Sequence, residues 1–148
     1  MGNHLFSRGV HGGGGGEYHE GWPERDLIPI PGIVTIAPAN AYELVGLMRS
    51  AYEYKGPVMV LLQISAGGLP EFKCKIPEKY YNIPLGKARI VHEGSDVTVV
   101  TYGAACVAAA NNEAISLEEE GVSVEVIDLR TIQPVDVSCI EESLQKTG

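Results

Sequence analysis

Five consecutive glycines near the start of the chain, Gly12–Gly16, lead directly into Glu17, Tyr18 and His19. Glycines let a backbone approach a ligand closely, and an imidazole exchanges protons near neutral pH, so Tyr18 and His19 could form one wall of a reaction site. Two other interpretations compete: a Gly-rich connection without a binding role, or a loop that holds phosphate. The phosphate interpretation is the weakest, because no Lys-Ser/Thr pair opens a helix after the glycines and no strand precedes them.

The segment that begins at His11 also has the form of the oxyanion loop in lipase-like hydrolases. Such an enzyme needs a Gly-x-Ser-x-Gly turn for its nucleophile, and the nearest sequence, at residues 63–67, lacks the first glycine. A hydrolase is therefore disfavoured. A metal site built on histidine is disfavoured too, because the four histidines show no i,i+4 pairing and no neighbouring cluster of carboxylates.

The composition, 45% hydrophobic and 20% charged over 148 residues, is typical of soluble globular proteins. A formal charge of −8 with only 11 scattered Lys and Arg residues argues against a nucleic-acid partner. The sequence contains no apolar run long enough to span a membrane and no secretory pattern at its start. We therefore expect an intracellular protein without nucleic-acid or membrane partners.

The three cysteines, Cys74, Cys106 and Cys139, lie far apart and form no Cys-x-x-Cys pair. We expect reduced thiols. Cys106 and Cys139 fall in predicted helices, where small apolar packing residues are the simplest interpretation.

The first half of the chain predicts a strand-helix-strand unit. The β-branched run at 33–37 and the apolar run at 56–62 indicate buried strands. Between them, Asn40 followed by Glu43 predicts an N-cap with a capping-box partner. The apolar residues of the helix that follows recur at i, i+3, i+4 and i+7, which gives it one face: Leu44, Leu47, Met48 and Ala51. Strands connected in this way are normally parallel.

The second half repeats the alternation after a Pro- and Gly-rich stretch. Strands are predicted at 96–103 and 122–130, with a helix at 104–121 that ends at Gly121. Its apolar stripe is Val107, Ala110, Ala114 and Leu117. Asp136 is predicted to cap a last helix, 137–148, with Val137, Ile140 and Leu144 on its apolar face.

The resulting fold class is α/β, with mainly parallel strands and covering helices. We expect three parts: residues 1–63, a linker at 64–93, and residues 94–148. Each half lacks strands that a stable sheet needs, so we expect a fragment of a longer protein or a chain completed by a partner.

Three long segments, residues 18–62, 81–104 and 121–148, resemble the beta subunit of thiamine-diphosphate-dependent 2-oxo acid dehydrogenases. These are the decarboxylating components for pyruvate, branched-chain 2-oxo acids and acetoin, in the transketolase superfamily. The strongest motifs are "IPLGKA" with "EGSDVT" and "VTYG", and "EVIDLRT" with the terminal "KTG". The resemblance implies that residues 1–63 end a pyrimidine-binding domain and that 94–148 form part of a transketolase C-terminal domain.

The resemblance implies a role for His19. The family places a Gly-rich loop and then Tyr-His-Ser-Gln about twelve residues before a Pro-Gly that opens a strand, and Tyr18-His19 stand at that spacing from Pro31-Gly32. His19 is thus expected to be the active-site histidine that faces the cofactor and the 2-oxo substrate, and Tyr18 to contact the cofactor. This sequence departs from the family at Glu20-Gly21, which replace Ser-Gln and leave the substrate class open.

The resemblance also implies cofactors and partners. Thiamine diphosphate and Mg would be held mainly by an alpha subunit and by residues upstream of residue 1, including the family's Glu that protonates the aminopyrimidine. A potassium ion would bind main-chain carbonyls at Ala51, Tyr54 and Gly56. The expected partners are the alpha subunit, a second beta subunit and a dihydrolipoyl acyltransferase, whereas Asp128, Arg130 and Asp136 are expected to be structural. The chain alone is not expected to be active.

Three interpretations therefore remain. The leading one is part of a 2-oxo acid dehydrogenase beta subunit, in the bacterial cytoplasm or in the mitochondrial matrix of a eukaryote, that contributes to oxidative decarboxylation and to reductive acylation of lipoyl groups. The second is a transketolase-type enzyme or deoxyxylulose-phosphate synthase, although the phosphate-binding arginines such enzymes need are not evident. The third is a non-catalytic α/β interaction module.

Overall fold

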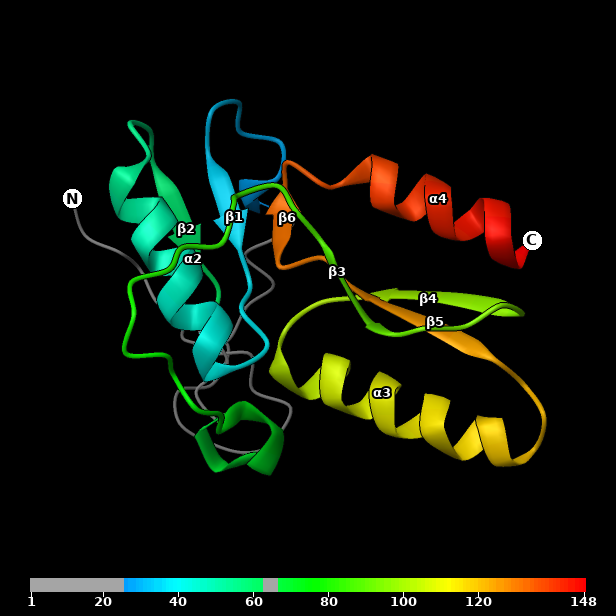
Figure 1. Ribbon diagram of the computed structural model, residues 1–148. Helices are drawn as coiled ribbons and strands as arrows, with labels where there is room; N and C mark the ends of the chain where they lie inside the picture. The colour runs from blue at the N-terminus through cyan, green and yellow to red at the C-terminus, as the bar shows by residue number, and fades with distance from the viewer. Residues whose placement is uncertain (1–25, 63–66) are drawn as a thin grey trace, which may run out of the picture.

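The computed structural model describes residues 26–62 and 67–148, and Figure 1 shows two groups of strands with helices packed beside them. The elements in chain order are β1 (Val34–Ile36), α2 (Ala41–Glu53), β2 (Val58–Val60), the 3-10 helix η3 (Pro70–Phe72), β3 (Arg89–His92), β4 (Val97–Thr101), α3 (Ala104–Glu119), β5 (Val124–Asp128), β6 (Thr131–Gln133) and α4 (Val137–Thr147). They form a first sheet, ordered β2-β1-β6, and a second sheet, ordered β3-β5-β4. The predicted α/β class is confirmed.

The first unit, β1-α2-β2, forms as the sequence predicted. β1 and β2 are parallel, with Val34 opposite Val58. Leu47 on α2 is fully buried against Ile36 and Val60, and the other predicted face residues pack around this core. The apolar run of each strand therefore faces a helix, as expected when helices cover a parallel pair.

The N-terminus of α2 differs from the predicted capping box by one residue. Asn40 is the N-cap, and its Oδ1 accepts a hydrogen bond from the Glu43 backbone N–H at 2.9 Å. The Glu43 carboxylate, however, accepts from the Ala39 N–H at 3.0 Å and not from the N–H of Asn40. The helix start is therefore capped as predicted, while the Glu43 side chain is turned into the protein interior.

The second unit, β4-α3-β5, is also parallel, with Val97 opposite Val124. In Figure 1, α3 lies on one face of the second sheet and α4 on the other. α3 ends at Gly121, whose φ of +83° is accessible to glycine at little steric cost. The Gly121 N–H donates to the Glu118 carbonyl and the Val122 N–H to the Leu117 carbonyl, which is the Schellman arrangement. The predicted helix stop is confirmed.

Two strands were not predicted. β3 lies inside the expected linker and pairs antiparallel with β5. β6 pairs antiparallel with β1, so a strand from the C-terminal part of the chain completes the first sheet. The first sheet therefore combines strands from two of the three predicted parts, residues 1–63 and residues 94–148, which the predicted division at 64–93 separates.

α4 forms where predicted, with Asp136 as its N-cap residue, but its predicted apolar face is wrong. The Asp136 side chain makes no capping hydrogen bond to the helix. Val137 and Leu144 are 51% and 53% exposed, whereas Ser143 is buried and its Oγ lies 2.7 Å from Thr98 Oγ1. Because this hydroxyl pair joins α4 to β4, the helix turns a polar stripe toward the sheet.

All three cysteines are free, as predicted. Cys139 is partly buried on α4, but Cys106 is exposed on α3, so its prediction as an apolar packing residue is wrong. Among the described residues, no helix is long and apolar enough to cross a membrane.

The stretch at 81–83 is anchored along α2. Ile83 donates its N–H to the Gly46 carbonyl at 3.2 Å and accepts from Ser50 Oγ at 2.6 Å. A Cβ at Gly46 would lie 2.7 Å from Ile83 Cγ1 and 2.9 Å from Tyr81 Cε2. Gly46 therefore permits a close approach that a larger residue would block.

We expect Gly46→Ala to lower the free energy of unfolding by about 1–3 kcal/mol, because the added methyl group overpacks this contact. Urea denaturation of the chain measures this. Gly68→Ala is the matched control, since a Cβ there meets nothing within 4 Å. Equal losses in the two variants would show that the 81–83 stretch is not held tightly against α2.

Candidate functional site

Tyr18 and His19, the predicted reaction-site residues, lie outside the described residues, so their roles stay predictions. The structure does describe the Pro31-Gly32 turn on which their assignment depends. Gly32 has a φ of +84°, and the turn leads directly into β1. The motif used to place His19 thus opens a strand here, as it does in the family.

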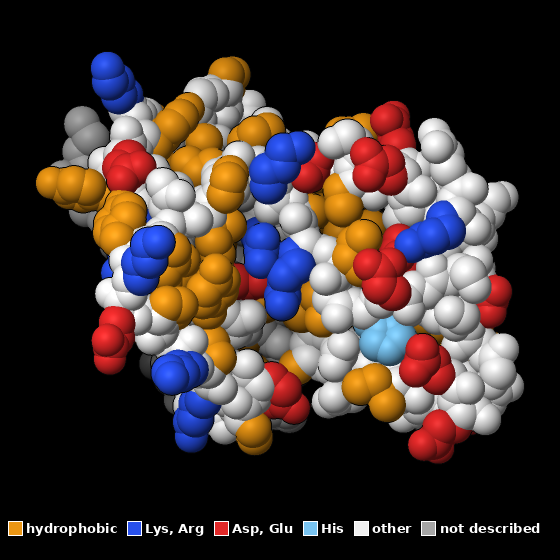
Figure 2. Space-filling view, in the orientation of Figure 1, with side chains coloured by type: hydrophobic (Ala, Val, Ile, Leu, Met, Phe, Trp, Pro, Cys, Tyr) orange, Lys and Arg blue, Asp and Glu red, His pale blue; other side chains and the backbone are white. Residues whose placement is uncertain are grey.

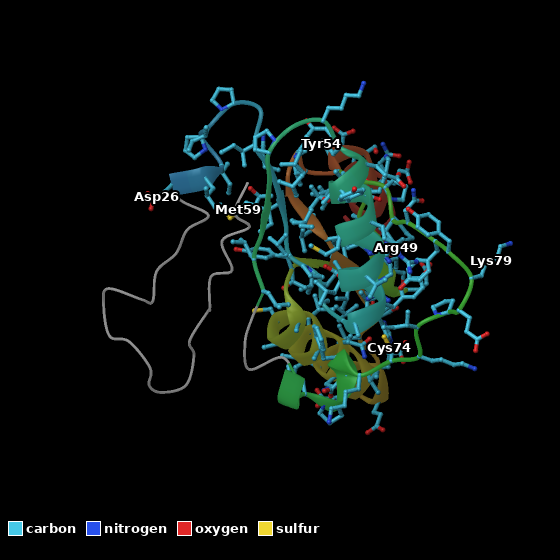
Figure 3. All side chains as sticks on the ribbon, turned by 90° about the vertical axis from the view of Figure 1, so that its left-hand side faces the viewer. Asp26, Arg49, Tyr54, Met59, Cys74 and Lys79 are labelled. Atoms are coloured by element: carbon cyan, nitrogen blue, oxygen red, sulfur yellow. The ribbon has the colours of Figure 1, made fainter. Side chains whose placement is uncertain are left out.

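The three residues expected to offer carbonyls to potassium lie together at the C-terminus of α2. Ala51 is in the last turn, Tyr54 is the C-cap, and Gly56 follows before β2. The Tyr54 ring folds over Gly56, where a Cβ would lie 2.5 Å from Tyr54 Cε1. Figure 3 shows Tyr54 at this end of α2.

The C-terminus of a helix can in general attract a cation. The last carbonyls of a helix have no partner within it, and they carry the negative end of the helix dipole. Among the described residues, no backbone N–H outside α2 donates to the carbonyls of Ala51, Tyr54 or Gly56. Carbonyl oxygens are ligands that potassium accepts in place of water. The described residues contain no group of three or more His, Cys, Asp or Glu side chains that could hold a metal ion.

The most concentrated charge in the described chain is a buried network between the two sheets, here called the Glu43 network: Glu43, Arg89, Asp128 and Arg130. Glu43 is fully buried, and its Oε1 accepts a hydrogen bond from Arg130 Nε at 2.9 Å. Arg89 Nε also lies 2.9 Å from this oxygen, but without hydrogen-bonding geometry. Arg89 therefore contributes mainly its charge.

Asp128 is the least satisfied member of the Glu43 network. Its Oδ1 accepts from the Arg130 backbone N–H at 3.0 Å, but its buried Oδ2 has no hydrogen-bond partner and lies 3.7 Å from Arg89 Nη2. Burial and the negative charge of Glu43 raise the pKa of Asp128 to about 7, against the opposing effects of the Arg130 N–H and Arg89. A group with this pKa titrates near neutral pH.

A second buried carboxylate, Glu125 on β5, is paired differently. Lys146 of α4 donates to its Oε2 and also to Glu93 Oε2, the latter at 3.2 Å. Burial raises the pKa of Glu125. The hydrogen bond and the charge of Lys146, together with hydrogen bonds from other partners, outweigh burial, so the pKa of Glu125 is lowered overall. This pair holds α4 on the second sheet.

The outward face of α2 carries an aromatic and apolar surface. Tyr42 and Tyr81 stack with ring centroids 4.5 Å apart, and the Arg49 guanidinium lies 4.7 Å from the Tyr80 ring centroid. In Figure 3, Arg49 lies midway along α2, beside the segment marked by Cys74 and Lys79. An open groove of about 600 Å³ runs here, lined by Leu44, Val45, Met48, Arg49, Tyr52, Glu53 and Tyr80. Figure 2 shows hydrophobic side chains gathered over this half of the molecule.

The sequence did not predict the Glu43 network. Asp128 and Arg130 were expected to be structural, which the full burial of Asp128 and the partial burial of Arg130 support, and Glu43 was expected only as a helix-start residue. Its members are separated by up to 87 positions along the chain, so no local pattern could join them. One feature of the sequence could have indicated the network: Asp128 ends β5, and Arg130 follows two residues later.

Comparisons with known proteins agree with these features. The family described as "Transketolase, C-terminal domain" matches residues 86–148. The pyruvate dehydrogenase E1 component subunit beta of Staphylococcus aureus (strain COL) is 40% identical over 143 residues, which cover 95% of this chain and 43% of that protein. The corresponding protein of Staphylococcus epidermidis is 38% identical over 143 residues, covering 97% of this chain and 42% of its own length.

Solved structures give the same fold. A split-gene transketolase, described as an inactive β4 tetramer, superposes with a TM-score of 0.72 at 27% identity, covering 88% of this chain and 41% of that one. A transketolase mutant from Pichia stipitis has a TM-score of 0.60 at 18% identity, with 86% of this chain and 18% of that chain covered, and supports the fold alone.

The chain spans less than half the length of the curated relatives it matches, 43% in the first case. The family expected from the sequence is nevertheless confirmed: residues 86–148 carry a transketolase C-terminal domain, and the chain is related along most of its length to pyruvate dehydrogenase E1 beta subunits.

Proposed function

We propose that this chain acts as part of the beta subunit of a thiamine-diphosphate-dependent 2-oxo acid dehydrogenase. The observation that carries the proposal is the 40% identity over 143 residues to a pyruvate dehydrogenase E1 beta subunit, since coverage of 95% of the chain includes the segment with Tyr18 and His19. The reaction would be oxidative decarboxylation of a 2-oxo acid followed by reductive acylation of a lipoyl group. Pyruvate is the substrate that the relatives' names favour.

In this proposal the chain contributes proton management and orientation. Thiamine diphosphate, when bound, supplies the electron sink for decarboxylation. His19 would hold or deliver a proton beside the substrate, a role that an imidazole fills near neutral pH. Tyr18 would contact the cofactor, as the family resemblance implies.

The diphosphate and Mg are proposed to be held mainly by an alpha subunit. Potassium is proposed at the C-terminus of α2, on the carbonyls of Ala51, Tyr54 and Gly56. A second beta subunit and a dihydrolipoyl acyltransferase would complete the assembly. The bacterial relatives favour a cytoplasmic location.

The proposal predicts that, in the chain reconstituted with an alpha subunit, His19 is needed for lipoyl reductive acylation and much less for binding of thiamine diphosphate. We expect His19→Ala to lower lipoyl reductive acylation by about 100-fold or more, within the range for general acid-base groups, and to change affinity for thiamine diphosphate less than about threefold. Steady-state kinetics and calorimetry measure the two effects. His92→Gln is the control, because the His92 Nδ1 lies 2.9 Å from the Val124 carbonyl, in the second sheet.

Equal losses of acylation and binding in His19→Ala would contradict the role given to this histidine. Calorimetry of the chain alone tests the shared cofactor site. Tight binding of thiamine diphosphate and Mg without an alpha subunit would contradict the proposed division of the site. Failure to bind even with one would instead favour a non-catalytic interaction module.

A potassium site on α2 predicts a cation-specific stabilisation of the reconstituted assembly. Exchanging NaCl for KCl at constant ionic strength should raise the thermal unfolding midpoint, because a ligand that binds only the folded state stabilises it. Gly56→Ala should reduce this response, since its Cβ would lie 2.5 Å from Tyr54 Cε1 and displace the Tyr54 ring that covers this turn. Gly68→Ala, with nothing within 4 Å, should keep it. Equal midpoints in the two salts would argue against the site.

A further inference from the structure

The chain passes from the second sheet to the first at Arg130. β5 ends at Asp128, and β6 begins at Thr131. Leu129 donates its N–H to the carbonyl of Thr101, the last residue of β4, at 2.9 Å. The Arg130 carbonyl accepts a hydrogen bond from the N–H of Ala37, which directly follows β1, at 2.8 Å. Two consecutive residues, Leu129 and Arg130, therefore make hydrogen bonds to different sheets.

Arg130 occupies a backbone conformation that residues with a Cβ rarely adopt. Its φ is +56°, in the left-handed region, and it is the one non-glycine with positive φ in the described residues. Such a conformation persists only where surrounding contacts impose it. Here the Arg130 N–H donates to Asp128 Oδ1 at 3.0 Å and the side chain donates to Glu43 Oε1 at 2.9 Å.

Charged groups from three parts of the fold lie around Asp128 and Glu43: Arg89 is 3.7 Å from Asp128, and the Arg130 guanidinium bonds to Glu43. Glu43 comes from α2, Arg89 from β3 and Arg130 from the turn after β5. Asp128 and Glu43 are fully buried, and Asp128 Oδ2 has no hydrogen-bond partner. A buried carboxylate oxygen without a partner is unfavourable when ionised, and a proton removes that charge.

We propose that the Glu43 network is a proton-sensitive latch between the two sheets, closed when Asp128 carries a proton and loosened when it loses that proton. In the closed state Glu43 alone carries negative charge, and both guanidinium groups face it. In the ionised state two buried carboxylates lie in one network, and one Asp128 oxygen has no hydrogen-bond partner. Because α2, β3 and the β5-β6 turn all contribute, loosening acts on the contact between the sheets.

The direction of the pH effect follows from the pKa of Asp128, which burial and Glu43 raise to about 7. A raised folded-state pKa gives stability that is complete below the unfolded value, near 4, and is lost as pH rises through about 7. The lowered pKa values of Glu125 and Asp136 act oppositely and at acidic pH. The window from about pH 5.5 to 8.5 therefore isolates Asp128 from these two carboxylates.

The first test compares urea unfolding of the chain, Asp128→Asn and Glu141→Gln across that window. We expect the unfolding equilibrium constant of the unmodified chain to rise with pH across this window. The rise should be about tenfold or more larger than in Asp128→Asn, because the amide of that variant cannot ionise. Glu141→Gln, an exposed change on α4, should follow the unmodified chain. Equal pH dependence in the chain and Asp128→Asn would overturn the proposal.

Two measurements on the unmodified chain keep the proposal testable if Asp128→Asn does not fold. Carboxyl carbon NMR of the four aspartates should show one midpoint near 7, and four midpoints below about 5 would overturn the proposal. Hydrogen exchange reports the latch itself. After correction for intrinsic rates, protection of the Ala37 amide should fall at least about fivefold between pH 6 and 8.5 relative to that of Leu61, which bonds within the first sheet to Ile36. Unchanged relative protection would show that no latch opens.

Discussion

The hydrogen-bonded ion pair between Glu43 and Arg130 joins the first turn of α2 to the turn between the two sheets. Glu43 accepts from the N–H of Ala39 before α2 and from Arg130 between the two sheets. Removing one partner of a buried pair leaves an uncompensated charge and costs about 3–5 kcal/mol. The position of α2 relative to the β5-β6 turn therefore depends on this pair.

This constraint reaches the proposed reaction site through the backbone. Ala37, directly after β1, bonds to the Arg130 carbonyl, and the Pro31-Gly32 turn leads into β1 from the segment that contains His19. α2 begins beside Glu43 and ends at the proposed potassium site. The Glu43 network, the Pro31-Gly32 turn and the C-terminus of α2 are therefore connected through β1 and α2.

Local signals made much of the fold predictable. Asn40 and Gly121 set the start of α2 and the end of α3, because a cap needs only a few neighbouring residues. The parallel pairs β1-β2 and β4-β5 followed from apolar runs separated by amphipathic helices. The family was predicted in a different way, from sequence motifs that resemble it and that extend across the C-terminal domain.

Features that depend on distant residues were not predictable in this way. β6 has three residues and forms a strand because β1 lies beside it, and β3 is specified by β5. The apolar residues of α4 predicted the wrong buried face because Ser143 and Lys146 find polar partners in Thr98 and Glu125. The Glu43 network needed the arrangement of both sheets. In each case the deciding partner lies far away in sequence.

The contact between the two sheets is tested most directly by a double-mutant cycle on Glu43→Gln and Arg130→Gln, with unfolding free energies measured for the chain, both single variants and the double variant. If this pair joins the sheets as described, the coupling energy should exceed about 1 kcal/mol. The double variant should then lose less unfolding free energy than the sum of the losses in the two single variants. A coupling energy within about 0.3 kcal/mol of zero would show that the two residues act independently and would contradict the account.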